Sequence, residues 1–344
     1  MNIYKILKLN NSIKSHRIKF LGLWILNVLN KRYLAIQLDT VMACNLRCKM
    51  CYFTDENYVR NNMKGMFSLD DLEAIAKVNF KNALKLQIGC GTEPTLFKHN
   101  TKLIEIAKNY KVPYISMVTN GNLLSEKDIA EFSKAGLNEF IISMHGVTKA
   151  TYEDLMGKAN YEKFHEILGY ISNEKKINPK LLLRINYTFN QDNFIELKHF
   201  FELFGQYSID IIQLRPIDKI GETTYNNFSL KNIESNYKEI LDFLNSEATK
   251  KGITLLSPET IIRNETKSFV VDTKNNSSYL KPYTYCYVSP NFFWKDDFNW
   301  KNETFSDWKK KHKWNYQLFK NIFISKKELE KPNRNMLNYT IDIN

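Results

Sequence analysis

Six short apolar segments, each followed by a stretch with the periodicity of a helix, fill the middle of this chain. Their residues do not alternate between apolar and polar, which is typical of strands buried on both faces of a parallel sheet. Right-handed crossovers curl such a run of βα units into a barrel or a partial barrel. The sequence therefore predicts an α/β fold, a partial (β/α)6 TIM-like barrel with its functional groups at the carboxyl ends of the strands. The predicted strands are Leu34–Asp39, Leu84–Gly89, Tyr114–Thr119, Glu139–Ser143, Leu181–Phe189 and Ile209–Arg215.

The pattern divides the chain into three parts. Residues 1–33 form a lead-in with an amphipathic helix, and residues 34–220 form the barrel. Residues 221–344 begin with a helix over 230–250 and a possible strand over 253–257. A cap follows, which we expect to be irregular with one or two helices, because it is too aromatic to be a disordered tail. Its tryptophans are Trp294, Trp300, Trp308 and Trp314.

The longest apolar run, Phe20–Leu29, is about half the length that a membrane-spanning helix needs. Basic residues precede it, as in a signal peptide, but no small-residue cleavage site follows. We interpret the run as an amphipathic helix packed on the end of the barrel. The alternative is that residues 18–30 form a helix that lies on a membrane surface. The preceding basic residues are Lys14, His16, Arg17 and Lys19.

The charge balance favours acidic partners without identifying one. The 344 residues include 49 Lys and Arg and 37 Asp and Glu, which gives a net charge of +12. In a chain rich in Lys and Asn, a net charge of this size can come from amino-acid composition alone and does not require an acidic ligand. Nucleic-acid binding requires basic residues gathered on one face, whereas here they are spread along the chain. We therefore expect no nucleic-acid partner.

Cysteine usage indicates a reducing compartment. The chain has five cysteines, an odd number, and three of them lie within eight residues. Such a set is a poor disulfide framework and is typical of a metal site in an intracellular protein. We therefore predict a cytoplasmic, metal-binding protein.

The three clustered cysteines are Cys44, Cys48 and Cys51, in the spacing C-x3-C-x2-C directly after the first predicted strand. Three thiolates on one loop can hold three irons of a [4Fe–4S] cluster and leave the fourth iron open to an external ligand. The alternative is a structural zinc ion with a fourth ligand from elsewhere. Zinc sites usually carry paired C-x2-C knuckles, and the sequence has neither a second knuckle nor an H-x3-H pair.

A C-x3-C-x2-C loop after the first strand of a βα-repeat chain resembles the radical S-adenosylmethionine (radical SAM) superfamily. The flanking residues Leu38–Thr40 and Asn45–Arg47 resemble members that modify peptides, proteins or small metabolites. The resemblance covers about residues 34–220. It implies two cofactors, the [4Fe–4S] cluster and S-adenosyl-L-methionine (SAM).

The resemblance implies an enzyme in which the reduced cluster cleaves SAM and the 5′-deoxyadenosyl radical abstracts a hydrogen atom from the substrate. It does not name the substrate, and a peptide or protein, a sugar and a small metabolite all stay open. The alternative, from another class, is a non-catalytic relative that keeps the cluster as a structural or sensing element. Departures from the family pattern favour that alternative.

Two motifs resemble the SAM contacts that the family makes near its cluster. Met50 stands where the family usually has an aromatic residue that touches the adenine, and the soft, apolar Met side chain can make the same contact. After the second predicted strand, Gly89–Pro94 resembles the family's Gly-Gly-Glu-Pro stretch, which binds the ammonium of SAM. We expect Glu93 to hold the cofactor rather than the fold. The residues implied in this contact are Gly91, Thr92, Glu93 and Pro94.

Further SAM contacts are implied at the ends of later strands. Ser143 matches a family serine whose hydroxyl contacts SAM, and Asn186 matches a family asparagine on the fifth strand. The helix arginine that usually reaches the SAM carboxylate is absent, and Arg184 or Lys158 is the candidate to replace it. His145 replaces a usual aspartate; it is a solvated turn residue or a donor to the substrate that titrates near neutral pH.

Only Cys90 and Cys286 remain outside the cysteine loop. Two cysteines cannot supply the four thiolates of an auxiliary cluster, so we predict a single cluster. We expect Cys90 to be a small packed residue, with a thiol that faces the substrate as the alternative. Without a second cluster to relay electrons, the resemblance implies a flavodoxin- or ferredoxin-type electron donor, and a net charge of +12 would steer such an acidic protein.

Overall fold

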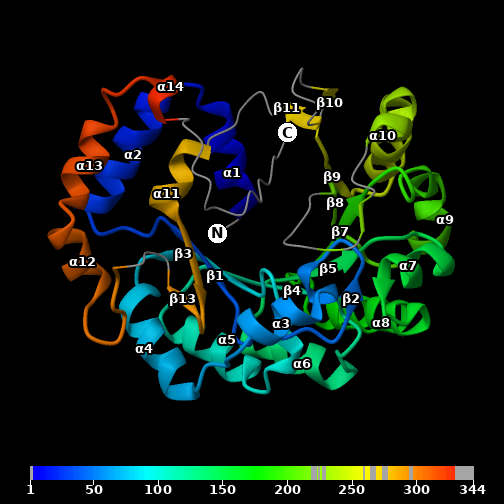
Figure 1. Cartoon of the computed structure of the whole chain (residues 1–344), viewed down its shortest axis with the longest axis horizontal. Helices are drawn as coiled ribbons and strands as arrows, with labels where there is room; N and C mark the ends of the chain where they lie inside the picture. The colour runs from blue at the N-terminus through cyan, green and yellow to red at the C-terminus, as the bar shows by residue number, and fades with distance from the viewer. Residues whose placement is uncertain are drawn as a thin grey trace.

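One large sheet organises the chain, with helices along its outer side (Figure 1). The computed structural model describes residues 3–217, 223, 225–226, 230–258, 260–263, 269–272, 278–293 and 297–329. Within these residues the sheet has nine strands, of which eight run parallel and one edge strand pairs antiparallel. In spatial order they are β13 (Phe292–Phe293), β12 (Tyr285–Ser289), β1 (Leu34–Leu38), β3 (Ala83–Ile88), β4 (Tyr114–Thr119), β5 (Glu139–Met144), β7 (Leu182–Phe189), β8 (Ile211–Pro216) and β9 (Thr254–Leu256).

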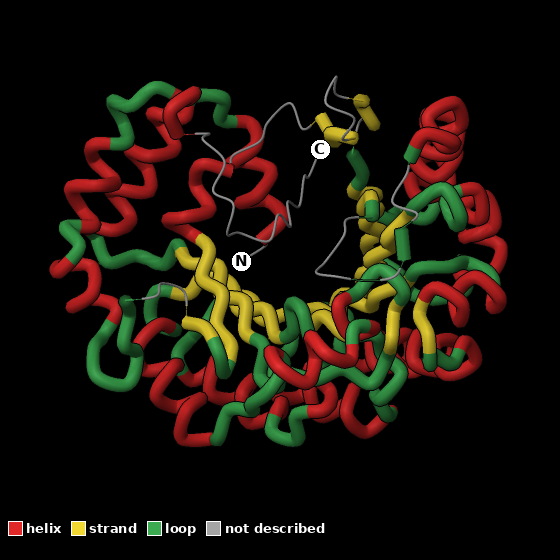
Figure 2. The backbone as a smooth tube through the Cα atoms, viewed as in Figure 1, coloured by secondary structure: helices red, strands yellow, loops and turns green. Residues whose placement is uncertain are grey.

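The six predicted strands are confirmed as β1, β3, β4, β5, β7 and β8, with ends that differ by at most two residues. The possible strand over 253–257 is β9. The two edges, β13 and β9, do not pair with each other within the described residues, so the sheet forms an open partial barrel (Figure 2). This is the α/β, partial-barrel fold that the sequence predicts. Strand β12, beside β1, is not among the predicted strands.

Helices connect the strands and cover the convex face of the sheet (Figure 2). Ser68 and Ser125 begin α4 and α6 with capping boxes, and Gly136 ends α6 with a φ of 109°. The helices are α3 (Glu56–Asn62), α4 (Leu69–Asn79), α5 (Asn100–Asn109), α6 (Glu126–Ala135), α7 (Lys149–Leu155), α8 (Tyr161–Ile177), α9 (Phe200–Phe204) and α10 (Glu234–Lys250). The short 3-10 segments are η1 (Tyr52–Thr54), η2 (Pro94–Leu96), η3 (Ile195–His199), η4 (Lys231–Ile233) and η5 (Ser278–Leu280). Two small sheets pair β2 (Arg47–Cys48) with β6 (Met156–Gly157) and β10 (Thr260–Arg263) with β11 (Phe269–Asp272).

The elements at the two ends of the chain pack around the barrel. They are α1 (Ile3–Ser12), α2 (His16–Val28), α11 (Lys281–Thr284), α12 (Phe305–Lys311), α13 (Trp314–Lys320) and α14 (Lys326–Leu329). Tyr4 of α1 hydrogen-bonds Glu139 at the amino-terminal end of β5. Helix α2 packs against α13, and Phe20 and Leu23 of the apolar run belong to the same hydrophobic core as the barrel strands. Trp308 and Trp314 are buried core residues, while Trp294 lies outside the described residues.

The predicted boundary at residue 220 does not separate the sheet from the rest of the chain. Strands β9 and β12 both come from the stretch predicted as a helix and cap, yet they pair with β8 and β1 of the barrel. This stretch therefore helps to build the sheet. In the described part of the chain no helix is long and apolar enough to cross a membrane.

The two faces of the sheet differ in chemistry. On the convex face, Ile36, Leu86 and Ile115 lie in one hydrophobic core with the helices, and all are fully buried. The alternating residues on the concave face are largely polar. Tyr287, Gln37, Gln87 and Ser116 are neighbours in register on four adjacent strands, as are Ser143, Asn186 and Gln213 on three others.

Candidate active site

The cysteine loop begins where β1 ends, at the carboxyl edge of the sheet. The Cys51 amide donates to the Cys48 carbonyl at 2.9 Å, and the pairing of β2 with β6 places Cys48 opposite Met156. The Arg47 guanidinium donates to the carbonyl oxygen of Cys44 at 2.9 Å. Main-chain hydrogen bonds and the Arg47 side chain therefore hold the conformation of the loop.

The three thiols are half-buried and influence one another electrostatically. Burial raises the pKa of Cys44 to about 12, with further contributions from Glu93 and Cys51. The pKa of Cys48 lies well above its usual value because of burial first and then the other two thiols. Three soft sulfur donors on one loop fit a [4Fe–4S] cluster. The raised pKa values do not oppose this, because a bound metal deprotonates the thiols that coordinate it. Among the described residues, no three Cys, His, Asp or Glu side chains gather as ligands of a single metal ion.

Asp39, the residue after β1, organises the loop that follows β3. Its buried carboxylate accepts hydrogen bonds from the Cys90 amide (2.7 Å), the Gly91 amide (3.1 Å) and the Thr92 hydroxyl (2.9 Å). The Tyr287 hydroxyl donates to the same carboxylate at 2.8 Å. Burial raises the pKa of Asp39, and these donors oppose the rise. The sequence did not lead us to expect this role for Asp39. The signal for it is a carboxylate directly after a buried strand.

Glu93 is hydrogen-bonded within the fold, which corrects the expectation that it serves the cofactor rather than the fold. Its Oε1 accepts from the Thr95 amide (3.1 Å), the Thr95 hydroxyl (2.5 Å) and the Thr119 hydroxyl (2.6 Å). Its Oε2 accepts from the Asn120 amide at 2.8 Å. A carboxylate offers about four acceptor sites, two on each oxygen. Oε1 accepts three hydrogen bonds and Oε2 accepts one, so Oε2 has a site to spare. Glu93 thus caps η2 and keeps one oxygen that can accept from a cationic ligand.

The turn after β4 connects the Glu93 loop to the cysteine loop. Besides its bond to Glu93, Asn120 donates through Nδ2 to Asn45 Oδ1 at 2.9 Å. On the other side of the cysteine loop, the Tyr52 hydroxyl donates to the Gly91 carbonyl. A Cβ at Gly91 would lie 2.9 Å from that hydroxyl, so a larger residue there would displace the Tyr52 side chain. The sequence signal for this turn is weak, because Asn-Gly marks many turns.

Two methionines at the cysteine loop are core residues. Met50, predicted to touch the adenine, is buried in the main hydrophobic core. Met156, which stands where the family has its arginine, is also buried. A Cβ on the neighbouring Gly157 would lie 2.7 Å from the Arg47 carbonyl oxygen, which explains the glycine at that position. Lys158, the next residue, is exposed and has a φ of 73°. The adenine contact of Met50 stays a prediction.

Of the three residues predicted on β5 and β7, two lie together. Ser143 and Asn186 are opposite each other in register, and Asn186 Oδ1 has no hydrogen-bond partner within the described residues. Arg184 is buried, and it donates to Glu139 at 2.7 Å and to Gln213 at 3.0 Å. Because Glu139 is the first residue of β5, this ion pair holds Arg184 toward the amino-terminal end of the sheet. The arrangement does not support its predicted contact with the SAM carboxylate.

The positive charge of Arg215 acts on both His145 and Cys90. The pKa of His145 is lowered to about 4, by burial first and then by Arg215, so titration near neutral pH is not supported. Burial raises the pKa of Cys90, Asp39 adds to the rise, and Arg215 opposes it. The Cys90 thiol donates to Gln37 at 2.6 Å. It is thus half-buried on the polar face rather than packed as a small core residue.

Cys286 lies on the other side of the sheet. It is fully buried on β12, and its sulfur accepts from Asn79 of α4 at 3.8 Å. Because residues on the convex face pack against the helices, Cys286 and Cys90 are separated by the sheet itself. The two remaining cysteines therefore do not lie on one face.

Residues 40–202 match the family model described as the Radical SAM superfamily, and they include the whole cysteine loop. With the three-thiol loop and most of the partial barrel inside it, this part of the chain is a radical SAM domain, and members of that superfamily are enzymes that use a [4Fe–4S] cluster and SAM. The predicted family and cofactors are confirmed.

Two similar curated proteins are both named Probable GTP 3′,8-cyclase. The one from Sulfolobus acidocaldarius is 25% identical over 207 residues, which cover 59% of this chain and 63% of that protein. The one from Saccharolobus solfataricus is 29% identical over 229 residues, which cover 63% of this chain and 67% of that protein. The chain thus spans about two thirds of the length of these relatives.

Similar solved structures share the fold. SuiB of Streptococcus suis bound to S-adenosylmethionine has a TM-score of 0.56 and 15% identity, with coverage of 79% of this chain and 62% of SuiB. SuiB bound to the precursor peptide SuiA has a TM-score of 0.57 and 16% identity, with coverage of 83% and 64%. The protein anSMEcpe with bound AdoMet has a TM-score of 0.50 and 19% identity, with coverage of 64% and 63%.

Proposed function

We propose that this protein is a radical SAM enzyme with a single [4Fe–4S] cluster, held by Cys44, Cys48 and Cys51, and that its substrate lies against the concave face of the sheet. When bound, the cluster and SAM supply a 5′-deoxyadenosyl radical that abstracts a hydrogen atom from the substrate. One observation carries the proposal: Asn120 hydrogen-bonds both Asn45 of the cysteine loop and Glu93. The loop that would hold the cluster and the carboxylate that would bind SAM thus form one unit.

The residues of the chain bind and orient the cofactor in this proposal. Oε2 of Glu93 would accept a hydrogen bond from the SAM ammonium, and Asp39 holds the Gly91 amide and the Thr92 hydroxyl of the same loop in place. Pro94, at the first position of η2, fixes the turn that aims the Glu93 carboxylate. Ser143 and Asn186 offer a hydroxyl and an amide on the neighbouring strands.

A single cluster is supported by the positions of the other two cysteines. Cys286 is buried behind the sheet, and Cys90 faces the concave side with its thiol bonded to Gln37. An external electron donor then has to reduce the cluster, and we propose a protein of the flavodoxin or ferredoxin type.

The concave face supports a polar substrate. The interior of a barrel is usually filled with branched apolar side chains, whereas here Gln37, Gln87, Ser116 and Gln213 line the sheet. The Arg215 guanidinium, which acts on both Cys90 and His145, adds positive charge at the carboxyl end. We therefore propose a hydrogen-bonding substrate with an anionic group. A nucleotide, as in the name of the curated relatives, fits this chemistry, and so does an acidic sugar or peptide.

Anaerobic reconstitution tests the proposed function. The protein should bind about four irons and, with a chemical reductant and SAM, release 5′-deoxyadenosine and methionine. Cys44→Ala, Cys48→Ala and Cys51→Ala should each remove the iron, because each loses one of three loop ligands. Cys286→Ala is the matched control and should keep both iron and SAM cleavage. Loss of iron in Cys286→Ala would contradict the single-cluster proposal.

The non-catalytic alternative rests on two departures in the site. Met156 replaces the family arginine with a buried apolar side chain, and Glu93 is already bonded by four protein donors. A protein that holds the cluster but forms no 5′-deoxyadenosine under any reducing condition would favour a structural or sensing role.

A further inference from the structure

Helix α2 presents an apolar face to solvent. Its inner side buries Phe20 and Leu23, and its outer side carries Ile18, with 57% of its surface exposed. Surface helices of soluble proteins normally carry polar residues on the outer side, so the predicted amphipathic pattern is not present. The exposed apolar residues, at helical spacings of i, i+3, i+7, i+10 and i+11, are Ile18, Leu21, Ile25, Val28 and Leu29.

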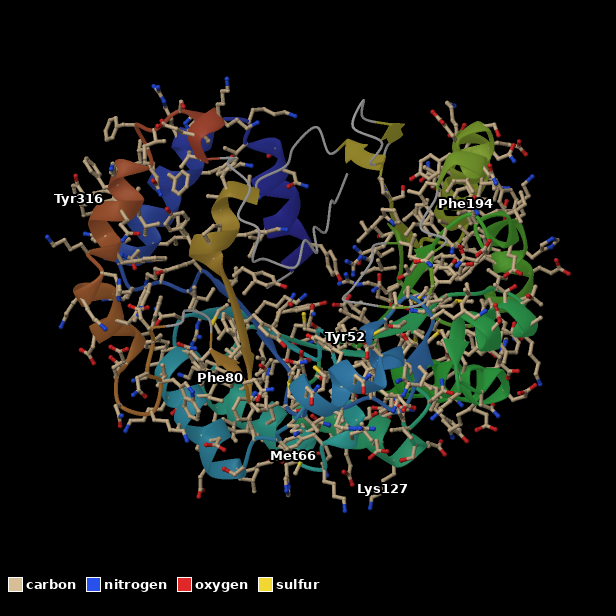
Figure 3. All side chains as sticks on the ribbon, in the orientation of Figure 1. Tyr52, Met66, Phe80, Lys127, Phe194 and Tyr316 are labelled. Carbon is tan, nitrogen blue, oxygen red and sulfur yellow. The ribbon has the colours of Figure 1, made fainter. Side chains whose placement is uncertain are left out.

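Helix α13 and the turn after it extend this apolar face. The two helices run antiparallel, because Asn27 of α2 donates to Asn315 at 3.4 Å while His16 lies 3.0 Å from the Ile324 carbonyl. Trp24 of α2 packs on Phe319 with ring centroids 5.5 Å apart, and Phe319 packs on Phe323 at 5.3 Å. Tyr316, Phe319 and Phe323 are exposed, and Tyr316 projects outward at the left of Figure 3. We call these three residues, the four exposed residues of α2 and the Leu29 that follows it the α2/α13 patch.

The net charge of the protein is concentrated in the same part of the chain. Residues 1–38 contain seven Lys and Arg and no Asp or Glu, and residues 308–327 also contain seven and none. The other 286 residues contain 35 basic and 37 acidic residues. The basic residues are therefore spread along the chain, but the positive excess is not. The exposed basic residues of these two segments include Lys14, Arg17, Lys31, Lys310, Lys311, Lys313, Lys320, Lys326 and Lys327.

We propose that the α2/α13 patch docks on a membrane surface that contains anionic lipids. Exposed Ile, Leu, Val and Phe side chains can enter the boundary between headgroups and acyl chains, while Lys and Arg around them contact the negative headgroups. The protein would lie on the bilayer, because no described helix is long enough to cross it. Both the shape of the apolar stripe and the sign of the charge fit this one partner.

Other occupants fit the patch less well. A second copy of the chain, placed patch to patch, would bring two positively charged surfaces together, and like charges repel. A nucleic acid would match the charge but leave the apolar side chains uncovered. An acidic protein with an apolar groove would match both properties, and the experiment below separates it from a membrane.

Vesicle flotation with the cluster-loaded full chain tests the proposal. The protein should float with vesicles of phosphatidylcholine and phosphatidylglycerol, and not with phosphatidylcholine alone. The double variant Leu21→Gln, Ile25→Gln should bind the anionic vesicles about tenfold more weakly, because apolar insertion drives part of the affinity. Its melting temperature should match that of the wild type, since both side chains are exposed. Ile177→Gln, at a still more exposed apolar position of α8, is the control and should bind normally.

A charge variant completes the test. Lys320→Gln with Lys327→Gln should weaken vesicle binding several-fold, whereas Lys127→Gln on α6, labelled in Figure 3, should not. The proposal is overturned if the wild type does not float with anionic vesicles, or if the Leu21, Ile25 double variant floats as well as the wild type. A concentration-dependent dimer in sedimentation velocity that this double variant abolishes would assign the patch to self-association instead. SAM cleavage should be unchanged in all these variants.

Discussion

Two buried carboxylates set the geometry around the cysteine loop. Asp39 gathers the backbone after β3, and Glu93 ties that loop to the turn after β4. Both lie at the ends of parallel strands, where several main-chain amides point toward the same space. A carboxylate is suited to this position because it accepts several hydrogen bonds at once. In the proposed function, the residues that hold these loops would therefore also lie next to the cofactor.

Glu93→Gln should impair both the fold and the cofactor site. The glutamine amide places donors where Glu93 now accepts from Thr95, Thr119 and Asn120, so at least one bond is lost. We expect a loss of about 1–3 kcal/mol in the free energy of unfolding and of about 1.5–3 kcal/mol in SAM binding, which is about 10- to 150-fold in affinity. Denaturant unfolding and SAM titration measure the two effects.

The exposed Glu105→Gln on α5 is the control for this change and should leave both quantities unaltered. Unchanged unfolding of Glu93→Gln would contradict the capping role of the carboxylate. Unchanged SAM affinity would remove Glu93 from the cofactor site.

His145 should make the protein less stable in mild acid. Its pKa is about 4 in the folded protein, against an ordinary value of 6.5. The unfolded chain therefore takes up a proton between these values that the folded protein does not, and stability is lost as the pH falls from 6.5 to 4. The loss reaches about 3 kcal/mol at most. His145→Gln should flatten the dependence of the unfolding free energy on pH in this window, and parallel profiles for variant and wild type would show that His145 is not the cause.

At the scale of elements, the βα repeat was predictable because each strand is a continuous apolar run and each helix has its own cap. Strand β12 was not, because Tyr285 and Tyr287 face the polar side and its partner β1 is distant in sequence. Helix α2 was predictable as a helix, but its partner α13 was not, since no local pattern encodes which helices meet. In the site, the cysteine spacing identified the three thiols, while the assignments of Met50 and Arg184 depended on packing that a motif does not contain.

The pairing of β2 with β6 should be sensitive to one glycine. A methyl group on Gly157 would meet the Arg47 carbonyl at 2.7 Å, and that atom is backbone that cannot turn away. Gly157→Ala should therefore separate the strands, displace Cys48 and cost about 1–3 kcal/mol of stability. Iron content after reconstitution should fall with it. Gly169→Ala in α8, where a Cβ meets nothing within 4 Å, is the control and should keep full iron content.

At the scale of the whole molecule, the distribution of charge changes what the net charge implies. The +12 excess would steer an acidic electron donor only if it surrounded the cysteine loop, but it belongs to the segments around α2 and α13. Figure 1 shows these helices at the upper left and β2 at the right. Near the loop, Lys49 is paired with Asp154 at 2.6 Å. The steering expected from composition alone is therefore not supported.

Salt should affect binding at the α2/α13 patch more strongly than docking of an electron donor at the cysteine loop. Screening acts over about 8 Å at physiological ionic strength, so the charge near α2 contributes little to docking at the cysteine loop. We expect the rate of cluster reduction by an acidic flavodoxin to change less than about threefold between low and high salt, while binding to anionic vesicles is lost. Stopped-flow absorbance and flotation follow the two processes. A steep fall of the reduction rate with salt would show that local cations near the loop steer the donor.

The position of β12 has a consequence for how the protein is made. Ile36 of β1 pairs beside Cys286, 250 positions later in the chain. On the ribosome, β1 and the strands through β8 emerge long before β12, so one edge of β1 has no partner for most of translation. An unpaired strand edge is a template for aggregation. We therefore expect a polypeptide truncated before Tyr285–Ser289 to aggregate more readily than the full chain, because one edge of β1 stays unpaired.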